Sequence, residues 1–228
     1  MNNLAVSNDR TLDIEKFDMD SFFYTKSTLF KNLKTNTQVT DTFEIFFAIL
    51  LLVLFSPILI LVAVAIKFGM GGDIFYKQVR VGKDGSLFEI YKFRTMIENA
   101  EAQTGAVLAT KQDPRITKLG RFLRASHLDE FPQLINVLKG DMSFVGPRPE
   151  RPVFVDKFNE DIANYNRRHL VKPGITGLAQ VCLPYDATAK EKLQYDLYYI
   201  EHKDSVLFNV LISYYTALKM ISFVNFIR

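Results

Sequence analysis

Residues 46–66 read FFAILLLVLFSPILILVAVAI, and only Ser56 and Pro57 in this stretch are not apolar. As one straight helix the stretch would reach about 32 Å, which is enough to cross the hydrocarbon core of a bilayer. A proline at its midpoint removes a backbone hydrogen bond and clashes with the preceding turn. Three structures are therefore open: a kinked spanning helix, a re-entrant helix that returns to the side it entered from, and a helix buried in a soluble core.

The charges that flank this segment bear on the choice. Basic residues lie on both sides of it, before it at Lys26, Lys31 and Lys34 and after it at Lys67, Lys77, Arg80 and Lys83. This distribution has no inside/outside asymmetry, which fits a segment whose two ends lie on the same face of the membrane. The spanning and re-entrant forms remain equally open, whereas the scarcity of polar residues disfavours a soluble core helix.

Composition divides the chain into four regions. Residues 1–40 are a polar preamble, in which we expect a short interfacial helix at 20–34, and residues 41–68 hold the apolar segment. Residues 69–204 have the mixed composition of a soluble α/β domain, and residues 205–228 are apolar and aromatic. The polar start argues against a secretory signal.

Overall charge and cysteine content exclude some classes of protein. With 28 Lys and Arg against 25 Asp and Glu, the chain is not basic enough to indicate a nucleic-acid partner. The single cysteine, Cys182, rules out an internal disulfide and a multi-cysteine zinc site, and it favours reducing surroundings.

The mixed region predicts a mostly helical α/β domain with one β-hairpin. Strands are expected over 74–81 and 87–96, separated by the turn sequence Lys83-Asp84-Gly85-Ser86. Helices are expected over 116–125, 128–139, 153–169 and 187–202. The terminal segment 205–226 predicts a helix at the membrane interface, because Tyr and Phe are favoured at that depth. This helix is expected to pack on lipid or on a second copy of the chain in a homodimer.

The adjacent carboxylates Asp129 and Glu130 are the first candidates for chemistry. Pro132 is tolerated only in the first turn of a helix, so a helix is expected to begin near Asp129. Both carboxylates would then lie at the positive end of a helix dipole, where anions are stabilised. Acidic residues at a helix start are also an ordinary capping signature, and that alternative stays open for the pair taken alone.

Basic residues around this pair favour a site for phosphate. The candidates are Arg80, Lys92, Arg94, Arg121, Arg124, Arg148 and Arg151. On a strand, Lys92 and Arg94 would point to one face. Arg148 lies between Pro147 and Pro149, a stiff backbone that suits a guanidinium meant to bind phosphate oxygens in a bidentate fashion.

Two adjacent carboxylates can take complementary roles in phosphate chemistry. One can bind Mg²⁺, which accepts one or two protein carboxylates and takes its other ligands from phosphate and water. One can attack phosphorus as a nucleophile, as aspartyl-phosphate enzymes do. Arginines and the metal would neutralise the phosphoryl oxygens.

Five linked motifs make the chain, from about Thr42 to its C-terminus, resemble the bacterial sugar transferase family of monotopic phosphoglycosyl transferases. They are the Ser56-Pro57 break, IYKFRTM at 90–96, LDEFPQL at 128–134, LKGDMSFVGPRP at 138–149 and KPGITGLAQV at 172–181. This resemblance implies a fold with a re-entrant membrane helix broken at Ser56-Pro57. It also implies a place at the bacterial inner membrane, with the catalytic domain facing the cytoplasm.

The resemblance further implies a reaction in two half-steps. Asp129 would attack the β-phosphate of a UDP-sugar and release UMP, and polyprenyl (undecaprenyl) phosphate would then take the phosphosugar. Asp129 would also contact Mg²⁺, and Glu130 would position or deprotonate the acceptor phosphate. Family positions that bind substrate are matched by Lys92, Arg94, Arg124, Arg148 and Asp196.

Two features depart from the family pattern. Many members follow Ala179-Gln180-Val181 with an Asn-Gly-Arg turn, whereas this chain continues with Cys182-Leu183-Pro184-Tyr185-Asp186. The identity of the sugar donor is therefore open. Large members carry a multi-span region before the catalytic part, so we expect either a small member or a truncated form.

Three alternative functions compete with this one. A membrane-associated metal-dependent phosphohydrolase would use the same aspartate with water as acceptor. A scaffold that binds lipid phosphates would not account for a proline-flanked arginine beside a tandem acidic pair. A glycosyltransferase that releases UDP would need a metal-binding Asp-x-Asp motif at a strand end, and the triplet Asp18-Met19-Asp20 lies in the polar preamble.

Overall fold

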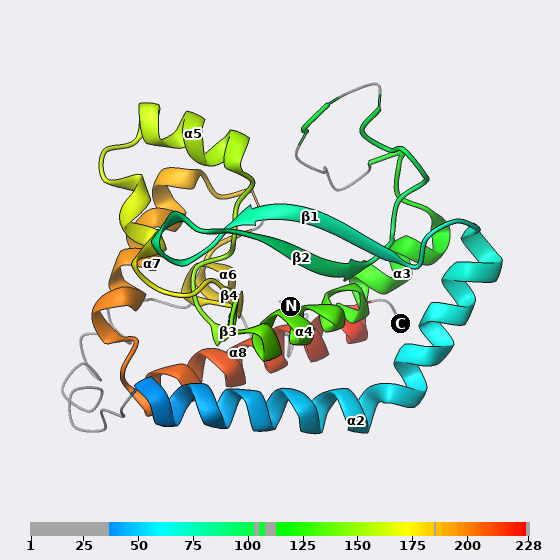
Figure 1. The fold of residues 1–228 in the computed structure, drawn as a ribbon, viewed down its shortest axis with the longest axis horizontal. Helices are drawn as coiled ribbons and strands as arrows, with labels where there is room; N and C mark the ends of the chain where they lie inside the picture. Colours follow the sequence, from blue (N-terminus) through cyan, green and yellow to red (C-terminus); the bar gives the residue numbers. More distant parts are fainter. Residues whose placement is uncertain (1–36, 103–104, 108–112, 185, 227–228) are drawn as a thin grey trace, which may run out of the picture.

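The computed structural model describes residues 37–102, 105–107, 113–184 and 186–226, and Figure 1 shows their arrangement. These residues form a mostly helical structure with two small sheets of two strands each. The helix expected at 20–34 lies outside the described residues. The mostly helical fold with a small β-hairpin agrees with the fold class predicted from the sequence.

The apolar segment forms helix α2 (Thr37–Met70), which contains Pro57. Figure 1 shows this helix as two arms that meet at a bend. A proline has no N–H to donate to the carbonyl four residues earlier, which here belongs to Val53. The Ser56 hydroxyl donates to that same carbonyl at 2.8 Å. Ser56 thus satisfies the backbone acceptor that Pro57 leaves unpaired, as an apolar environment requires.

Most of α2 faces away from the rest of the protein. Only 11% of its most apolar stretch is buried, and the mean hydropathy there is 3.2. The side chains of Phe46, Leu54 and Phe68 are 64%, 64% and 85% exposed. A soluble core helix would be mostly buried, so this alternative does not hold. By length and composition α2 is apolar enough to cross a membrane.

The predicted β-hairpin is confirmed. Strand β1 (Phe75–Val81) pairs antiparallel with β2 (Leu87–Phe93), and Tyr76 lies opposite Lys92. The turn between them contains a short 3-10 helix, η2 (Lys83–Gly85). Strand β2 ends three residues before the predicted end at residue 96, and Arg94 therefore follows the strand.

The helix expected over 128–139 is divided into two parts. The preceding helix, expected over 116–125, is α3 (Lys118–Ala125). It begins close to its predicted start, and the Thr117 side chain accepts a hydrogen bond from the N–H of Gly120 at 2.9 Å. It is followed by the 3-10 helix η3 (Leu128–Gln133) and then by α4 (Leu134–Lys139). His127 precedes η3 with φ 56°, and Pro132 supplies no N–H to an α-helical turn. The carboxylate pair therefore begins a 3-10 helix and not an α-helix.

The second half of the chain is also helical, with one further division. The helix expected over 153–169 is α5 (Pro152–Asp161) followed by η4 (Tyr165–Leu170), because Asn164 has a left-handed backbone with φ 62°. Helix α7 (Ala189–His202) is confirmed and begins with a capping box between Thr188 and Glu191. The expected terminal helix is α8 (Val206–Phe226).

A short parallel strand pair was not predicted. Strand β3 (Ser143–Val145) pairs with β4 (Gly174–Thr176), and α6 (Leu178–Cys182) follows. Strands of three residues are too short to show an alternating pattern. A Cβ on Gly174 would meet the backbone N of Gly146, so glycine allows the two segments to approach.

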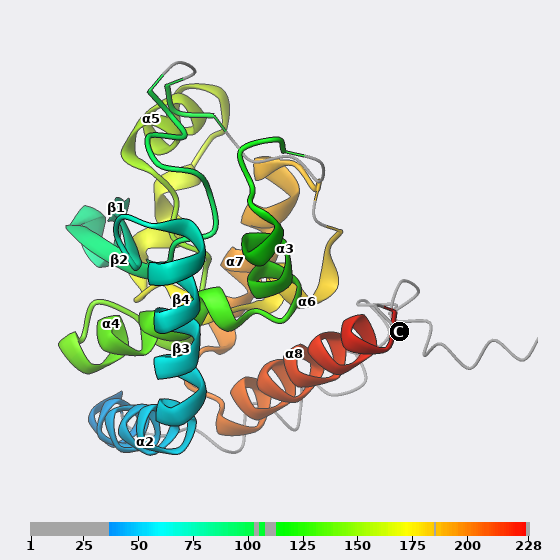
Figure 2. The same cartoon turned by 90° about the vertical axis from the view of Figure 1, so that its right-hand side faces the viewer.

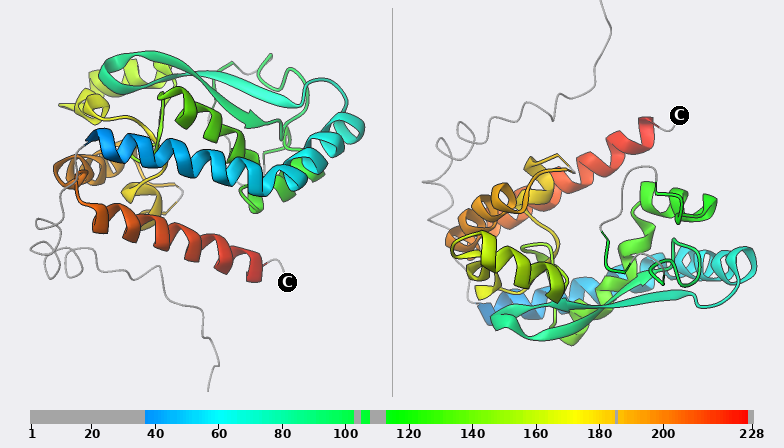
Figure 3. Two further views of the ribbon diagram at one scale, coloured as in Figure 1. Left: turned by 60° about the horizontal axis from the view of Figure 1, so that its bottom comes forward. Right: turned by 90° about the horizontal axis from the view of Figure 1, so that it is seen from above.

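Helices α2 and α8 lie on the same side of the molecule (Figures 2 and 3). Helix α8 buries Phe208 and Ile212 against the core and exposes Val210 and Tyr214, each 56% accessible. The side opposite the β1–β2 hairpin is thus apolar over both helices.

Candidate active site

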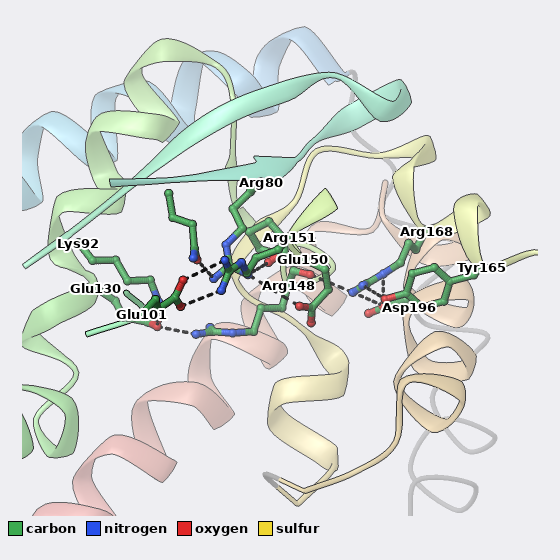
Figure 4. A network of polar contacts seen from close by, with 12 residues as sticks. Arg80, Lys92, Glu101, Glu130, Arg148, Glu150, Arg151, Tyr165, Arg168 and Asp196 are labelled. Carbon is green, nitrogen blue, oxygen red and sulfur yellow. Dashed lines mark hydrogen bonds and ion pairs between the residues drawn. The ribbon is translucent and has the colours of Figure 1, made fainter. Parts of the chain in front are cut away.

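The centre of the site is Glu130, which is bound by two cations from other elements. Its Oε1 accepts hydrogen bonds from Lys92 Nζ and Arg148 Nη2, both at 2.7 Å. Lys92 comes from β2, and Arg148 follows β3 in the Gly146-Pro147-Arg148-Pro149 turn. Figure 4 shows all three side chains in one network of polar contacts. The structure therefore brings together three of the residues singled out in the sequence.

Asp129 lies beside this cluster and is not neutralised by it. The residue is only 7% exposed, and within the described part of the chain its carboxylate takes part in no hydrogen bond or ion pair. Burial, together with the charge of Glu130, raises its pKa to about 6, while Lys92, Arg124 and Arg148 act in the opposite direction. Asp129 is therefore a buried carboxylate whose oxygen lone pairs are not used by any of the described residues.

Glu130 is in the opposite electrostatic state. Burial alone would raise its pKa, but the charges and hydrogen bonds of Arg148 and Lys92 outweigh burial and hold the pKa well below its usual range. Two neighbouring carboxylates thus have pKa values that are pushed apart by their surroundings, a pattern that separates roles in active sites.

Asn136 explains why Lys92 reaches η3. Its side chain is fully buried on α4; Oδ1 accepts from the backbone N–H of Tyr91 at 3.1 Å, and Nδ2 donates to the Glu89 carbonyl at 2.6 Å. The Asn136 amide thus makes the two backbone hydrogen bonds that a neighbouring strand would make with β2. This contact places Lys92, one residue after Tyr91, against the helix that carries Glu130.

The other predicted cations have separate positions. Arg124, on α3, donates from Nε to Thr95 Oγ1 at 2.9 Å, and its charge acts on Asp129. Arg94 is 7% exposed and binds the Gly71 carbonyl, with Glu98 3.9 Å away, so it holds the loop after α2. Lys92 and Arg94 therefore do not share a partner. Arg121 is exposed on α3.

Asp196, predicted to bind substrate, lies in a buried ion pair. Its Oδ2 is 2.8 Å from Arg168 Nη2 and 3.0 Å from Arg168 Nε, and both side chains are less than 5% exposed. Arg168 also donates to the Tyr165 hydroxyl at 2.6 Å and to the Arg148 carbonyl at 2.9 Å. Asp196 therefore pairs with Arg168, and Arg168 in turn binds the backbone of Arg148 (Figure 4).

Two more arginines extend the basic surroundings of Glu130. Arg80 donates to the Pro149 carbonyl at 3.0 Å and lies 3.8 Å from Glu150. Arg151 forms a bidentate pair with Glu101. Figure 4 shows Arg80 and Arg151 next to Arg148, beneath the β1–β2 hairpin.

The 3-10 helix η3, which carries the carboxylate pair, packs directly against the apolar helix α2. Phe131, which follows Glu130, packs on Phe55 of α2 with ring centroids 5.0 Å apart. Phe55 immediately precedes Ser56-Pro57, so the site lies next to the proline of α2.

The family model for bacterial sugar transferases matches residues 35–223. The chain belongs to this family. A UDP-N-acetylgalactosamine-undecaprenyl-phosphate N-acetylgalactosaminephosphotransferase of Aeromonas hydrophila is 46% identical over 176 residues, which cover 76% of this chain and 41% of that protein. The UDP-glucose:undecaprenyl-phosphate glucose-1-phosphate transferase of Escherichia coli K12 is 42% identical over 189 residues, or 80% and 39% of the two chains.

A shorter relative matches more of its own length. The putative undecaprenyl-phosphate N-acetylgalactosaminyl 1-phosphate transferase of Bacillus subtilis is 45% identical over 147 residues, which cover 64% of this chain and 78% of that protein. This bacterial sugar transferase thus spans about two fifths of the length of the Aeromonas and Escherichia relatives, and most of the length of the Bacillus one.

Sequence reasoning missed Arg168 and Glu101 of this bacterial sugar transferase. Arg168 follows Arg167, which is exposed, and nothing local in the sequence distinguishes the buried arginine from its neighbour. Glu101 is 50 residues from Arg151, its partner. Both roles depend on contacts between distant segments, which one sequence does not reveal.

The residues at the site fit a magnesium ion that is held mainly by substrate. No group of three or more His, Cys, Asp or Glu side chains that could hold a metal occurs among the residues described in the structure. Mg²⁺ commonly takes one or two protein carboxylates and completes its shell with phosphate oxygens and water. The free carboxylate of Asp129 suits such a site, whereas Oε1 of Glu130 is already bound by two cations.

Proposed function

We propose that this chain transfers a phosphosugar from a UDP-sugar to polyprenyl (undecaprenyl) phosphate and releases UMP. The Aeromonas, Escherichia and Bacillus relatives act, by their names, on undecaprenyl phosphate together with a hexose or N-acetylhexosamine 1-phosphate. The product would be a polyprenyl-diphosphate sugar. Such a product serves as the first membrane intermediate in the assembly of a bacterial polysaccharide or glycoconjugate.

The observation that carries this proposal is the difference between the two carboxylates. Asp129 is buried, free of hydrogen bonds within the described residues and close to three cations, whereas Glu130 is bound by two of them. A nucleophile needs free lone pairs, and the charge on a phosphoryl group needs nearby cations. The site offers both to an incoming phosphate.

The reaction has two displacements at the same phosphorus atom. In the first, an Asp129 oxygen forms a bond to the β-phosphorus, and the bond from that phosphorus to the UMP oxygen breaks. In the second, a phosphate oxygen of the polyprenyl phosphate bonds to the phosphorus, and Asp129 leaves as a free carboxylate. Lys92, Arg124 and Arg148 stabilise the charge on the phosphoryl oxygens.

Glu130 serves this reaction as a positioning residue. A general base works best with a pKa near the operating pH, and the pKa of Glu130 lies well below its usual range. Its carboxylate instead fixes the side chains of Lys92 and Arg148 in relation to each other. Of the two roles considered from the sequence, positioning is therefore the one we propose.

Magnesium would be held by Asp129 together with phosphate oxygens of the donor. When bound, the ion would neutralise charge on the diphosphate and on its leaving group. The chain's own contribution is a carboxylate whose oxygens, among the described residues, are not occupied by other side chains.

The membrane segment is proposed to be re-entrant, with both ends of α2 and the catalytic domain on the cytoplasmic side of the inner membrane. Support comes from the bend in α2, from the apolar side shared by α2 and α8, and from the contact between Phe55 and Phe131. In this arrangement the phosphate of a lipid acceptor lies at the depth of Asp129.

The proposed function is tested by identifying the released nucleotide. Purified protein in detergent receives a panel of UDP-sugars with Mg²⁺ and undecaprenyl phosphate, and we expect UMP with at least one donor. Without the acceptor, intact mass should show an added phosphosugar on the wild type and none on Asp129→Asn. Release of UDP, or an adduct that persists on Asp129→Asn, would contradict the proposal.

A further inference from the structure

A second arginine–carboxylate pair lies in the same charged network as Glu130 (Figure 4). Arg151 Nη1 and Nη2 lie 2.8 and 3.0 Å from Oε1 and Oε2 of Glu101. Two parallel N–H···O bonds are the geometry in which a guanidinium binds either a carboxylate or a phosphate. Glu101 thus takes the place that a phosphate group would take on Arg151.

The pair is electrostatically connected to the reacting carboxylate. The Tyr76 hydroxyl has a pKa raised by burial and by the charge of Glu101, and Arg151 and Arg124 act on it in the opposite direction. Arg124 also acts on Asp129. Arg124 is thus a charge that the surroundings of Tyr76, where Glu101 and Arg151 also act, share with the surroundings of Asp129.

Several features hold Arg151 in place for an anion. It is the N-cap residue of α5, a helix of ten residues, so the positive end of the helix dipole adds to its charge. Its guanidinium lies 5.7 Å from the centroid of the Phe154 ring. The Arg151 side chain is 17% exposed and that of Glu101 is 35% exposed, so the carboxylate is the partner with more freedom to leave.

We infer that Arg151 is a substrate phosphate-binding residue and that Glu101 is an internal anion that the incoming phosphate displaces. This inference rests on the proposed function, because both proposed substrates carry phosphate next to the reacting centre. The ligand chemistry is a phosphate oxygen, supplied either by the nucleotide donor or by the polyprenyl phosphate acceptor. Displacing Glu101 breaks an existing ion pair, so the pair weakens the apparent affinity for that phosphate.

The test compares wild type with Glu101→Gln, which removes the charge and keeps the size of the side chain. Calorimetry in detergent measures binding of UMP alone and, separately, of a short-chain polyprenyl phosphate. We expect the dissociation constant of one ligand to fall about fivefold, which corresponds to about 1 kcal/mol for a partly exposed pair. A change for UMP assigns the subsite to the nucleotide, and a change for the lipid phosphate assigns it to the acceptor.

Three further variants make the result specific. In an Arg151→Met background, Glu101→Gln should have no effect on binding. Arg151→Lys should weaken binding of the phosphate, because lysine lacks the two parallel N–H donors of the guanidinium. Glu160→Gln removes the same charge from an exposed position near the other end of α5 and should change nothing. Unchanged binding of both ligands in Glu101→Gln, or a gain that persists without Arg151, would overturn the inference. Because binding needs no turnover, failure of the transfer reaction would be seen separately, as absent UMP release by wild type.

Discussion

At Asp129, burial and a neighbouring negative charge act in the same direction. Its pKa is raised to about 6 because the carboxylate is desolvated and lies next to Glu130. At neutral pH the side chain is ionised, yet its charge is only partly balanced. A carboxylate in this state is more basic than an ordinary aspartate and is ready to form a bond to phosphorus.

A pH profile of the first half-reaction tests this assignment. The reactive carboxylate form is lost as the pH falls through about 6, so the second-order rate constant for the single burst of UMP release should drop about tenfold per pH unit below that value. The donor-only reaction is measured because the lipid acceptor is a phosphate monoester, whose second pKa lies near 6. A profile that stays flat down to about pH 4.5, well below the pKa of this carboxyl, would show that the group attacking phosphorus is not Asp129.

Asp129→Asn should stabilise the protein while it abolishes transfer. A carboxyl with a pKa raised from 3.8 to about 6 is disfavoured in its ionised form on folding, so its removal should raise the free energy of unfolding at neutral pH by about 3 kcal/mol. The gain should shrink as the pH falls from about 6 to about 4, since the wild-type carboxyl then binds its proton. Thermal unfolding at several pH values measures the difference, and a gain that is the same at every pH would show that the ionised carboxylate is not the source of the instability.

At the scale of elements, the turn that carries Arg148 is held in place by side chains of η4 and α7. The Arg168–Asp196 pair joins η4 to α7, and Arg168 reaches the Arg148 carbonyl. Tyr199, also on α7, donates to the Val145 carbonyl at 2.8 Å, just before the same turn. The rigidity inferred from two flanking prolines is thus supplemented by side chains from other helices.

Asp196→Asn distinguishes a positioning role from direct substrate binding. It leaves the charge of the buried Arg168 uncompensated, which should lower the free energy of unfolding by about 3 kcal/mol and raise KM for the donor. Chemical denaturation and steady-state kinetics measure the two effects. An apolar double replacement, Arg168→Met with Asp196→Leu, should recover much of the stability but not the KM.

Loss of activity in Asp196→Asn with unchanged unfolding would mean that Asp196 contacts substrate, as the family resemblance implied. The conservative variant Arg168→Lys provides the matched comparison. It keeps the charge but has no planar fork, so it should retain part of the stability and lose the contact with the Arg148 carbonyl.

Element prediction succeeded where the local pattern was strong. The turn sequence at Lys83–Ser86 predicted the hairpin β1–β2, and the helical patterns over 116–125 and 187–202 predicted α3 and α7, which the structure begins at Lys118 and Ala189. The division of the 128–139 helix follows from Pro132 within η3, and the division at Asn164 depends on a left-handed backbone at a residue other than glycine. Asn is enriched in that conformation, but most Asn residues do not adopt it, so the residue type alone does not predict where a helix ends.

At the scale of the whole molecule, two helices far apart in the chain form one apolar side. The N-terminal arm of α2 and helix α8 lie on the side opposite the β1–β2 hairpin, and the second arm of α2 rises from there to the start of β1 (Figures 1 and 3). Glu44 and Asp41 at the start of α2 bind this segment to the domain, through Ser143 at 2.5 Å and Lys172 at 3.0 Å. The polar end of α2 is therefore fixed at the level of β3 and β4, and its apolar length extends from there.

Accessibility labelling tests the re-entrant arrangement. Single cysteines placed near residues 40 and 70, in a background with Cys182→Ala, should both react from the cytoplasmic side of inverted vesicles. Intact cells treated with a membrane-impermeant reagent should leave both unlabelled. Labelling of the two positions from opposite sides would mean that α2 spans the bilayer.

The sequence by itself determined the apolar segment with its Ser-Pro break, the hairpin, most helix starts, the family and the residues at the centre of the site. Each of these features depends on residues that are close together in the sequence: on the spacing of apolar residues, on turn-forming residues or on a short motif. Only the tertiary structure decided that Glu130 is bound by Lys92 and Arg148 while Asp129 is left free of the residues described around it. Only the tertiary structure likewise shows that Asp196 pairs with Arg168, which in turn binds the Arg148 carbonyl. The pKa of a carboxyl and its choice of partner depend on burial and on charges from distant segments, which only the folded chain brings together.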